Sequence, residues 1–262
     1  MSDDPIFDPA FVAALFDRCS ARYRWWSAAA SFGMVAVWRR QCVNRLLGQR
    51  HIARLRDGTM QGPGPKAAPQ VADLMAGSGE VWAGLLRAIP RAQIAAIDIS
   101  PGMHAAALSR LAPAQARQIS HQTADILGLS LAADSADLVI STFGLKTFDP
   151  QQQRILARQI THILRPGGSF ALIEASDPRG WLLRPLYRFY LDRILPLIER
   201  LFLRGAQDFA MLGAYTRAFR DCAGFAQALR DEGLIVGEMR HFFGCATSVA
   251  GTKPVAPQTH SA

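Results

Sequence analysis

Two glycines and a carboxylate form the most informative pattern in the chain. Gly77 and Gly79 follow a mostly apolar run at 71–74, and Asp98 stands nineteen residues past Gly79, at the end of a second apolar run. This is the order of a strand, a glycine turn, a helix and a second strand. Such a unit presents backbone N–H groups to a ligand at the turn, and the carboxylate accepts hydrogen bonds from both hydroxyls of a ribose. The pattern predicts a nucleoside-containing cofactor.

The residues around the glycines indicate which cofactor. A dinucleotide-binding loop needs Gly or Ala three positions after its second glycine, and Trp82 occupies that position, so NAD is disfavoured. Asp73, which opens the loop, suits the amino group and sulfonium of S-adenosylmethionine (SAM). The loop resembles the first motif of class I methyltransferases. A strand-to-helix turn without any ligand is the alternative.

The elements that position this loop alternate along the chain. Strands are predicted at 70–74, 94–98, 118–122, 137–142 and 169–175, with helices after the first two strands and at 151–163. Asp149 is expected to cap the last of these helices, with Pro150 in its first turn. Alternating strands and helices predict a parallel sheet covered on both faces.

Helical segments surround this sheet. Residues 10–56 contain no proline and show apolar residues at helical spacing, so two or three helices are predicted, followed by a loop at 61–66. A second helical insertion is predicted at 179–219, divided by Pro185 and Pro196. A helix near 221–231 and strands near 234–241 and 244–250 complete the chain. We therefore expect a helical cap and linker at 1–66, a SAM-binding domain at 67–253 with a lid at 179–219, and a flexible tail at 254–262.

Composition narrows the class of protein. The 262 residues are 50% hydrophobic, enough for one sizeable core, and the formal net charge of +8 comes without a nucleic-acid recognition motif. The four cysteines have neither metal-ligand nor disulfide-framework spacing, so no metal site is predicted. The N-terminus lacks the pattern of a signal peptide, and the longest uncharged apolar run, 25–38, is shorter than the roughly 20 residues that span a bilayer. A cytoplasmic protein, soluble or peripheral at the inner face of the membrane, is expected, and nucleic acid is disfavoured as a partner.

Four segments together resemble the ubiquinone/menaquinone-biosynthesis C-methyltransferase family, over about residues 23–253. They are Tyr23 with 31–33 and 38–40, the loop 73–80, the segment 142–145, and the turn 164–168. The resemblance implies a Rossmann-like class I methyltransferase fold with a seven-stranded, mostly parallel sheet. It further implies SAM as cofactor and methyl transfer to a carbon of a quinol-like aromatic substrate.

Roles on the cofactor side follow. Gly77 and Gly79 have no side chain to keep the backbone from the methionine end of SAM. Asp98 is expected to bind the ribose hydroxyls, and the resemblance implies that Asp125 binds the adenine amino group. Tyr23 is expected to close over the cofactor, because an aromatic face favours the sulfonium charge. For Tyr23 a core or rim tyrosine is the alternative, and for Asp125 an exposed residue before a turn.

The substrate side departs from the family. After 143–145 the family usually carries Arg-Asn, whereas this chain carries Lys146 and Thr147. A quinol carbon attacks well only when a neighbouring hydroxyl loses its proton or its developing charge is stabilised. Lys146 is therefore expected to act as a cation or as a base, with a solvated loop lysine as the alternative. Phe32, Phe143 and Thr147 are expected at the substrate.

The histidines and arginines add two hypotheses. His241, just before the last strand, is a second catalytic candidate, while the other histidines are expected at the surface or in packing. Residues 179–204 contain six arginines and two acidic residues with interleaved aromatics, which suits contact with anionic lipid. A lid with solvated arginines is the alternative.

Two rival functions stay open. One is methyl or other group transfer from SAM to a different small aromatic or lipid, which the altered pair at 146–147 permits. The other is a catalytically silent SAM-binding scaffold in quinone biosynthesis. Turnover of SAM with an extracted quinone pool would separate a methyltransferase from a scaffold.

Overall fold

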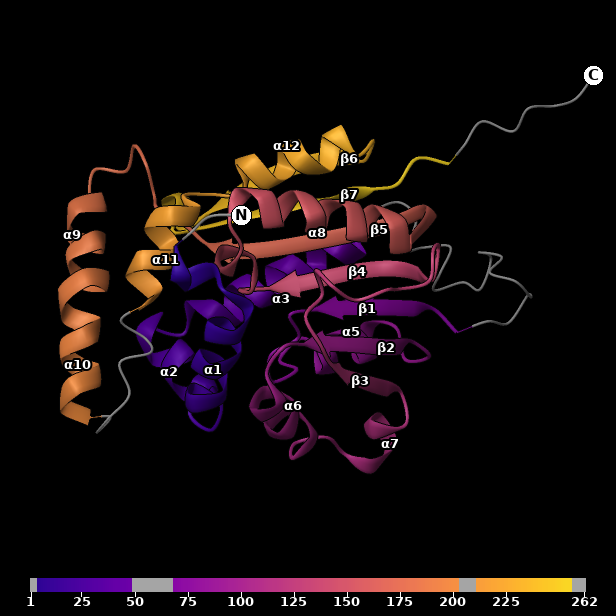
Figure 1. Ribbon diagram of the computed structural model, residues 1–262, viewed down its shortest axis with the longest axis horizontal. Helices are drawn as coiled ribbons and strands as arrows, with labels where there is room; N and C mark the ends of the chain where they lie inside the picture. The colour runs from indigo at the N-terminus through magenta and orange to yellow at the C-terminus, as the bar shows by residue number, and fades with distance from the viewer. Residues whose placement is uncertain (1–3, 49–67, 203–210, 256–262) are drawn as a thin grey trace, which may run out of the picture.

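The computed structural model describes residues 4–48, 68–202 and 211–255 (Figure 1). Helical elements precede the sheet: η1 Pro5–Phe7, α1 Pro9–Cys19, α2 Tyr23–Ala30 and α3 Met34–Leu47. The side chain of Asp8 caps α1 by accepting a hydrogen bond of 3.0 Å from the Phe11 N–H. The helices predicted over 10–48 are confirmed. Residues 49–56, the predicted loop at 61–66 and most of the predicted tail at 254–262 lie outside the described residues.

Seven strands form one sheet in the order β3-β2-β1-β4-β5-β7-β6. Their bounds are β1 Gln70–Leu74, β2 Gln93–Asp98, β3 Ile119–Thr123, β4 Ala136–Thr142, β5 Leu164–Ala175, β6 Ile235–His241 and β7 Ala246–Thr252. Strands β1 to β5 pair in parallel, and β7 runs antiparallel to both β5 and β6. The predicted α/β class with a mostly parallel seven-stranded sheet is confirmed. The strand order reverses between β1 and β4, which is where open α/β sheets bind ligands.

Helices cover both faces of the sheet. Besides α3, they are α5 Trp82–Ala88, α6 Pro101–Leu108, α7 Pro113–Ala116, α8 Pro150–Ile163 and α12 Ala223–Asp231. Successive side chains of β4 point to opposite faces: Leu138 and Ile140 join the core under α3 and α5, and Val139 joins the core under α8 and α12. The central strands are therefore apolar on both faces, as expected for a parallel sheet.

The predicted helix start at Asp149 is confirmed. The Asp149 carboxylate accepts from the backbone N–H groups of Gln151 and Gln152, each at 2.8 Å, and Pro150 occupies the first turn of α8. The following strand differs from expectation. β5 begins at Leu164 rather than after the predicted turn, because Leu164 already pairs with Ala136 before a register shift.

The inserted segment contains α9 Arg184–Phe189, the π-helix η3 Tyr190–Ile194, α10 Leu195–Phe202 and α11 Met211–Phe219. Figure 1 shows α9 and α10 as one helical run at the left edge of the molecule. As predicted, Pro185 and Pro196 stand at the starts of separate α-helices, α9 and α10, but the run stays helical because the π-helix η3 joins them. The Leu195 N–H bonds back to the Tyr190 carbonyl, and this wider turn lets the helix continue past a residue that has no N–H to donate. Within the described residues, no helix has the length and apolarity needed to span a bilayer.

Candidate active site

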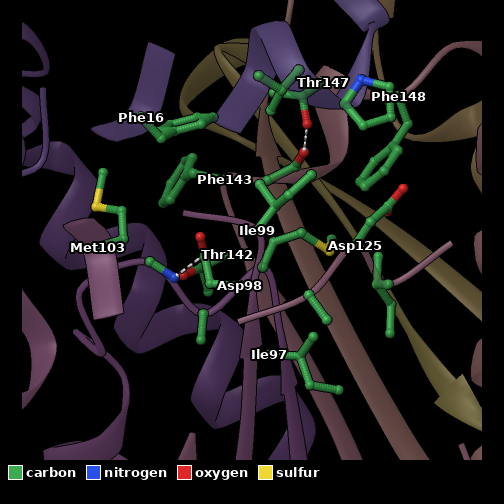
Figure 2. A pocket seen from close by; sticks show the side chains of 18 of the residues that line it. Phe16, Ile97, Asp98, Ile99, Met103, Asp125, Thr142, Phe143, Thr147 and Phe148 are labelled. Atoms are coloured by element: carbon green, nitrogen blue, oxygen red, sulfur yellow. Dashed lines mark hydrogen bonds between the residues drawn. The ribbon is translucent and has the colours of Figure 1, made fainter. Parts of the chain in front are cut away.

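A cavity lies at the carboxyl ends of β1, β2 and β4. The glycine loop after β1, the end of β2 and the turns at 124–127 and 142–148 form its walls, together with side chains of η1 and α1. Figure 2 shows Asp98, Asp125 and the rings of Phe16, Phe143 and Phe148 around this cavity. The structure therefore brings the glycine loop, the strand-end carboxylate and the predicted adenine-side carboxylate to one place.

Backbone conformation explains both glycines of the loop. Gly77 and Gly79 have φ values of 55° and 70°, in the left-handed region that glycine enters without steric cost. A Cβ at Gly79 would lie 2.4 Å from the Trp82 ring, so that position excludes every side chain. A Cβ at Gly77 would meet only the Glu80 carboxylate, at 3.8 Å. The open space beside Gly77 belongs to the cavity, so a ligand can approach its backbone closely.

Backbone N–H groups of the glycine loop and of the turn after β2 hold the Asp98 carboxylate in place. Its Oδ2 accepts from the Gly77 N–H at 2.7 Å and its Oδ1 from the Ser100 N–H at 2.9 Å. Burial raises the pKa of Asp98 to about 6, although both backbone hydrogen bonds favour the ionised form. Each carboxylate oxygen keeps a further lone pair, so the side chain can still accept from ribose hydroxyls.

Asp73 lies beneath the loop and is not part of the cavity wall. Its side chain is buried, and its Oδ2 accepts from the Trp82 indole N–H at 2.8 Å. Burial raises the pKa of Asp73 to about 8, and the hydrogen bond from Trp82 opposes that rise. The carboxylate therefore faces the Trp82 indole rather than the cavity. The Trp82 indole, which disfavours a dinucleotide-binding loop, fills the space over Gly79 and donates its N–H to Asp73.

Tyr23, Asp125 and two residues without a predicted role complete the polar wall. Burial raises the pKa of Tyr23 well above its usual range, and Asp125 Oδ1 accepts from a backbone N–H at 2.9 Å. Arg39 Nη2 lies 3.7 Å from Glu80 Oε1, while Arg39 Nε is buried without a hydrogen-bond partner among the described residues. Arg39 lines the cavity, so its guanidinium supplies a positive charge there that suits an anionic group such as the carboxylate of SAM. Arg39 stands in the segment 38–40 that carried the resemblance, but its type alone assigned no role.

A second cavity adjoins the first and shares Phe16, Tyr23 and Phe143 with it. Helices α1, α2 and α3 form one side, and α9, η3 and α11 form the other, with a mainly apolar lining. All four tyrosines of the chain line this cavity: Tyr23, Tyr187, Tyr190 and Tyr215. The Tyr190 hydroxyl donates to the Ala30 carbonyl at 2.9 Å and the Tyr215 hydroxyl to the Ile6 carbonyl at 2.6 Å. These bonds tie the inserted helices to the N-terminal ones.

The loop after β4 separates the two cavities. Phe143 has a φ of 66°, and the next carbonyl, of Gly144, accepts from the Thr147 hydroxyl at 2.7 Å. Lys146 Nζ donates to Glu174 Oε1 at 3.0 Å and to the Phe143 carbonyl at 2.5 Å. Glu174 is fully buried, and its Oε2 accepts from the Lys146 backbone N–H at 3.0 Å. Lys146 is thus a buried, paired residue on the wall of the second cavity and not a solvated loop lysine.

Of the predicted catalytic and substrate-side residues, two lie outside both cavity walls. Phe32 is 82% exposed, with its ring 5.5 Å from that of Tyr190. His241 is buried and shares a hydrogen bond of 2.8 Å with Ser248 Oγ, to which Arg45 also donates at 2.7 Å. Burial and the nearby Arg45 charge lower the pKa of His241. The expected place of both residues at the substrate is not found, because Phe32 points outward from a turn and His241 belongs to the packing of α3 on β6 and β7.

The model of the ubiE/COQ5 methyltransferase family matches residues 7–253. The chain belongs to this family. Ubiquinone/menaquinone biosynthesis C-methyltransferase UbiE of Syntrophotalea carbinolica is 32% identical over 192 residues, which cover 73% of each protein. Demethylmenaquinone methyltransferase of Mycobacterium marinum is 29% identical over 248 residues, or 94% of this chain and 95% of that protein.

Solved structures resemble this ubiE/COQ5 family member in fold. An O-methyltransferase family protein from Burkholderia thailandensis has a TM-score of 0.58 at 20% identity, covering 91% of this chain and 62% of that one. Human N-acetylserotonin methyltransferase in complex with SAM has a TM-score of 0.54 at 20% identity, covering 90% and 59%. This chain therefore spans about three fifths of those proteins, and the shared part is the class I SAM-dependent methyltransferase fold.

Proposed function

We propose that this methyltransferase transfers the methyl group of SAM to a ring carbon of a quinol-like aromatic substrate in quinone biosynthesis. The family match over residues 7–253 and the curated relatives support this reaction. Within the molecule, the observation that carries it is the pair of adjoining cavities that share Phe16, Tyr23 and Phe143. The first offers the polar groups that a nucleoside needs, and the mainly apolar lining of the second suits an aromatic ring with a lipophilic tail.

Residues of the first cavity hold the cofactor in this proposal. Asp98 accepts from the ribose hydroxyls, Asp125 accepts from the adenine amino group, and the backbone at Gly77 and Gly79 borders the methionine end. The Arg39 guanidinium donates to the methionine carboxylate, and Tyr23 faces the sulfonium. When bound there, SAM supplies an electrophilic methyl group. The protein's main task is then to align that methyl group with the attacking carbon at the shared wall.

Residues of the loop after β4 act on the substrate. A quinol carbon gains nucleophilicity as a neighbouring hydroxyl develops negative charge, so a fixed cation near that oxygen lowers the barrier. Lys146 supplies this charge in our proposal, with its Nζ positioned by Glu174 and the Phe143 carbonyl. Phe143 forms the partition against which the ring packs, and Thr147 keeps the turn closed through its bond to Gly144.

Two substitutions of Lys146 test its role. Lys146→Met should lower kcat by about 10² to 10³, the loss typical for one preorganised charge-stabilising donor, with cofactor affinity nearly constant in the folded enzyme. Lys146→Arg should keep much of the activity if positive charge matters. It should lose activity if a deprotonated amine acts as base, because arginine keeps its proton in proteins. A Met variant with wild-type kcat would remove Lys146 from the mechanism.

The substrate class is tested in a strain that lacks the gene. Mass spectrometry of extracted quinones should show a demethylated precursor that disappears when wild-type protein is restored. An Asp98→Ala protein, expressed at the same level, should leave the precursor in place. An unchanged quinone pool would contradict the proposed acceptor, and purified protein that converts no SAM with extracted quinols would favour a silent scaffold.

We also propose that the enzyme binds the membrane peripherally, since a substrate with a lipid tail resides there. The six arginines against two acidic residues in 179–204 support an anionic surface as partner. Binding to vesicles that contain phosphatidylglycerol should exceed binding to phosphatidylcholine vesicles and should fall as salt rises, because charges are screened over about 8 Å at physiological ionic strength. Equal binding to both vesicle types would contradict this electrostatic contribution.

A further inference from the structure

Three phenylalanines occupy turn positions that bulky residues normally avoid. Phe32, Phe242 and Phe243 have φ values of 51°, 43° and 57°, in the left-handed region. Their exposed fractions are 82%, 53% and 66%, so these rings gain little from the core. A strained turn that displays a large apolar side chain to the outside indicates a role at a surface rather than in packing.

The turns lie near the two ends of α9. Phe243 stacks at 5.3 Å on Trp181, which precedes α9, and Phe32 lies 5.5 Å from Tyr190, which follows it. Between them, Leu182, Leu186 and Phe189 have exposed fractions of 89%, 63% and 54%. These side chains form one apolar rim: Phe32, Leu182, Leu186, Phe189, Phe242 and Phe243.

The surroundings of the apolar rim indicate what it contacts. Arg179, Arg184 and Arg188 stand in the same segment with side chains that are 49%, 34% and 42% exposed; Arg179 and Arg184 share Asp177 and Arg188 pairs with Asp192, so three positive charges face two negative ones. An exposed apolar surface bordered by arginines suits the headgroup region of an anionic bilayer. Tyr187 and Tyr190 of the same helical run line the second cavity, and Phe32 of the rim packs beside Tyr190. The apolar rim thus borders the cavity proposed for the substrate, and Figure 1 shows that helical run at the outer edge of the molecule.

We propose that the apolar rim inserts into the interfacial layer of an anionic bilayer and holds the second cavity against the membrane surface. This inference rests on the proposed function, because a lipid-tailed substrate is what such docking would deliver. The rings and leucines supply an apolar contribution that salt does not screen, while the arginines supply the preference for anionic headgroups. Docking thereby sets the second cavity next to the layer from which the substrate is drawn.

The test removes two rings without disturbing the turn. In the double variant Phe242→Asn/Phe243→Asn, asparagine accepts the left-handed backbone more readily than phenylalanine, so the fold should persist. The matched control is Ile235→Thr, which alters an apolar residue that is 63% exposed at the other end of β6. Sedimentation with vesicles of phosphatidylcholine and phosphatidylglycerol at 3:1, in 0.5 M NaCl, reports the apolar contribution. Burial of each ring strengthens binding roughly tenfold, so the double variant should bind about 100-fold more weakly and the control like wild type.

Fluorescence and turnover supply independent readouts. Brominated lipids should quench Trp181 in wild type and much less in the double variant, because Trp181 stacks on Phe243. Turnover of a short-chain quinol in solution should be equal in both proteins, whereas turnover of a long-chain quinol in vesicles should fall about tenfold or more in the variant. If wild type converts neither quinol, the proposed function fails while vesicle binding still tests the apolar rim.

Two results would overturn the inference. The first is a double variant that binds vesicles as tightly as wild type in high salt. The second is a wild-type protein that does not bind vesicles but forms a dimer in analytical ultracentrifugation, with the dimer lost in the double variant. That outcome would assign the apolar rim to contact with a second copy of the chain.

Discussion

The two adjoining cavities are built by different means. The first is made by backbone: a glycine loop with left-handed φ values, a strand-end carboxylate held by two backbone N–H groups, and the carboxyl edge of a parallel sheet. The second is made by side chains from α1, α2, α3, α9, η3 and α11, which are far apart in the sequence. Cofactor recognition therefore depends on local geometry, and substrate recognition depends on tertiary assembly.

The largest expected effect concerns the partition between the cavities. Lys146→Met leaves the fully buried Glu174 without its cation, which should lower the free energy of unfolding by about 3 to 5 kcal/mol. The control is Arg230→Met, since the Arg230–Glu238 pair is 38% and 41% exposed and such surface pairs contribute about 0 to 1 kcal/mol. Urea denaturation of both variants measures the difference.

A double variant sharpens this result. Lys146→Met combined with Glu174→Gln removes both charges, so it should recover part of the stability that Lys146→Met loses. Equal losses for Lys146→Met and Arg230→Met would show that the partition is not held by a buried ion pair. In that case the Lys146–Glu174 pair would contribute no more to the free energy of unfolding than the exposed Arg230–Glu238 pair.

The next largest expected effect is on cofactor binding, and it distinguishes the roles of Asp98 and Asp73. Asp98→Ala should weaken binding of S-adenosylhomocysteine by about 1.5 to 3 kcal/mol, as for a hydrogen bond to a charged group. Asp73→Asn keeps an oxygen acceptor for Trp82 and does not touch the cavity wall, so affinity should stay near that of wild type. Isothermal titration calorimetry compares the two. A larger loss for Asp73→Asn would reverse their assignment.

Local motifs explain why the cofactor half could be predicted from sequence. The alternating pattern located all seven strands to within a few residues, except that β5 begins at Leu164, and the cap at Asp149 was located as well. Gly77, Gly79 and Asp98 are close in sequence and stand at strand ends, so their convergence follows from chain order. The residue type of Asp73 does not reveal which face of the loop its side chain takes, and the hydrogen bond from the Trp82 indole turns it away from the cavity.

Tertiary contacts explain why the substrate half could not be predicted in the same way. The pairing of Lys146 with Glu174 joins residues 28 apart, and the ring contact of Phe32 with Tyr190 joins segments more than a hundred residues apart. No local sequence motif predicts either contact. The continuity of the helix through Pro196 depends on a π turn that the proline itself does not encode. Local sequence patterns therefore do not predict the geometry where side chains from distant segments decide it.

A pH series extends the comparison to the charge of the first cavity. Asp98 has a pKa of about 6 because burial disfavours its ionised form, and ribose hydroxyls donate to that ionised form. Cofactor binding must therefore compete with a proton at lower pH, so affinity should be constant above pH 7 and fall towards about tenfold per unit below pH 6. Calorimetry from pH 5 to 8 measures this, and Asp98→Asn should remove the dependence. A flat wild-type profile would contradict the raised pKa.

The smallest effect tests whether His241 takes any part in the second cavity. His241 is buried, shares a hydrogen bond with Ser248 and lies on neither cavity wall, so His241→Asn should leave kcat unchanged and lower the free energy of unfolding by about 1 kcal/mol at pH 7.5. Its pKa is lowered by burial and by Arg45, so the unfolded chain binds a proton more readily than the folded one. Wild-type stability should therefore fall as pH drops below about 6.5, the ordinary pKa of histidine, and His241→Asn should reduce that fall. Urea denaturation at pH 7.5 and 5.5 measures the change, with kcat determined at pH 7.5. A large loss of kcat at unchanged stability would return His241 to the mechanism, and would mean that the second cavity extends to β6 when substrate is bound.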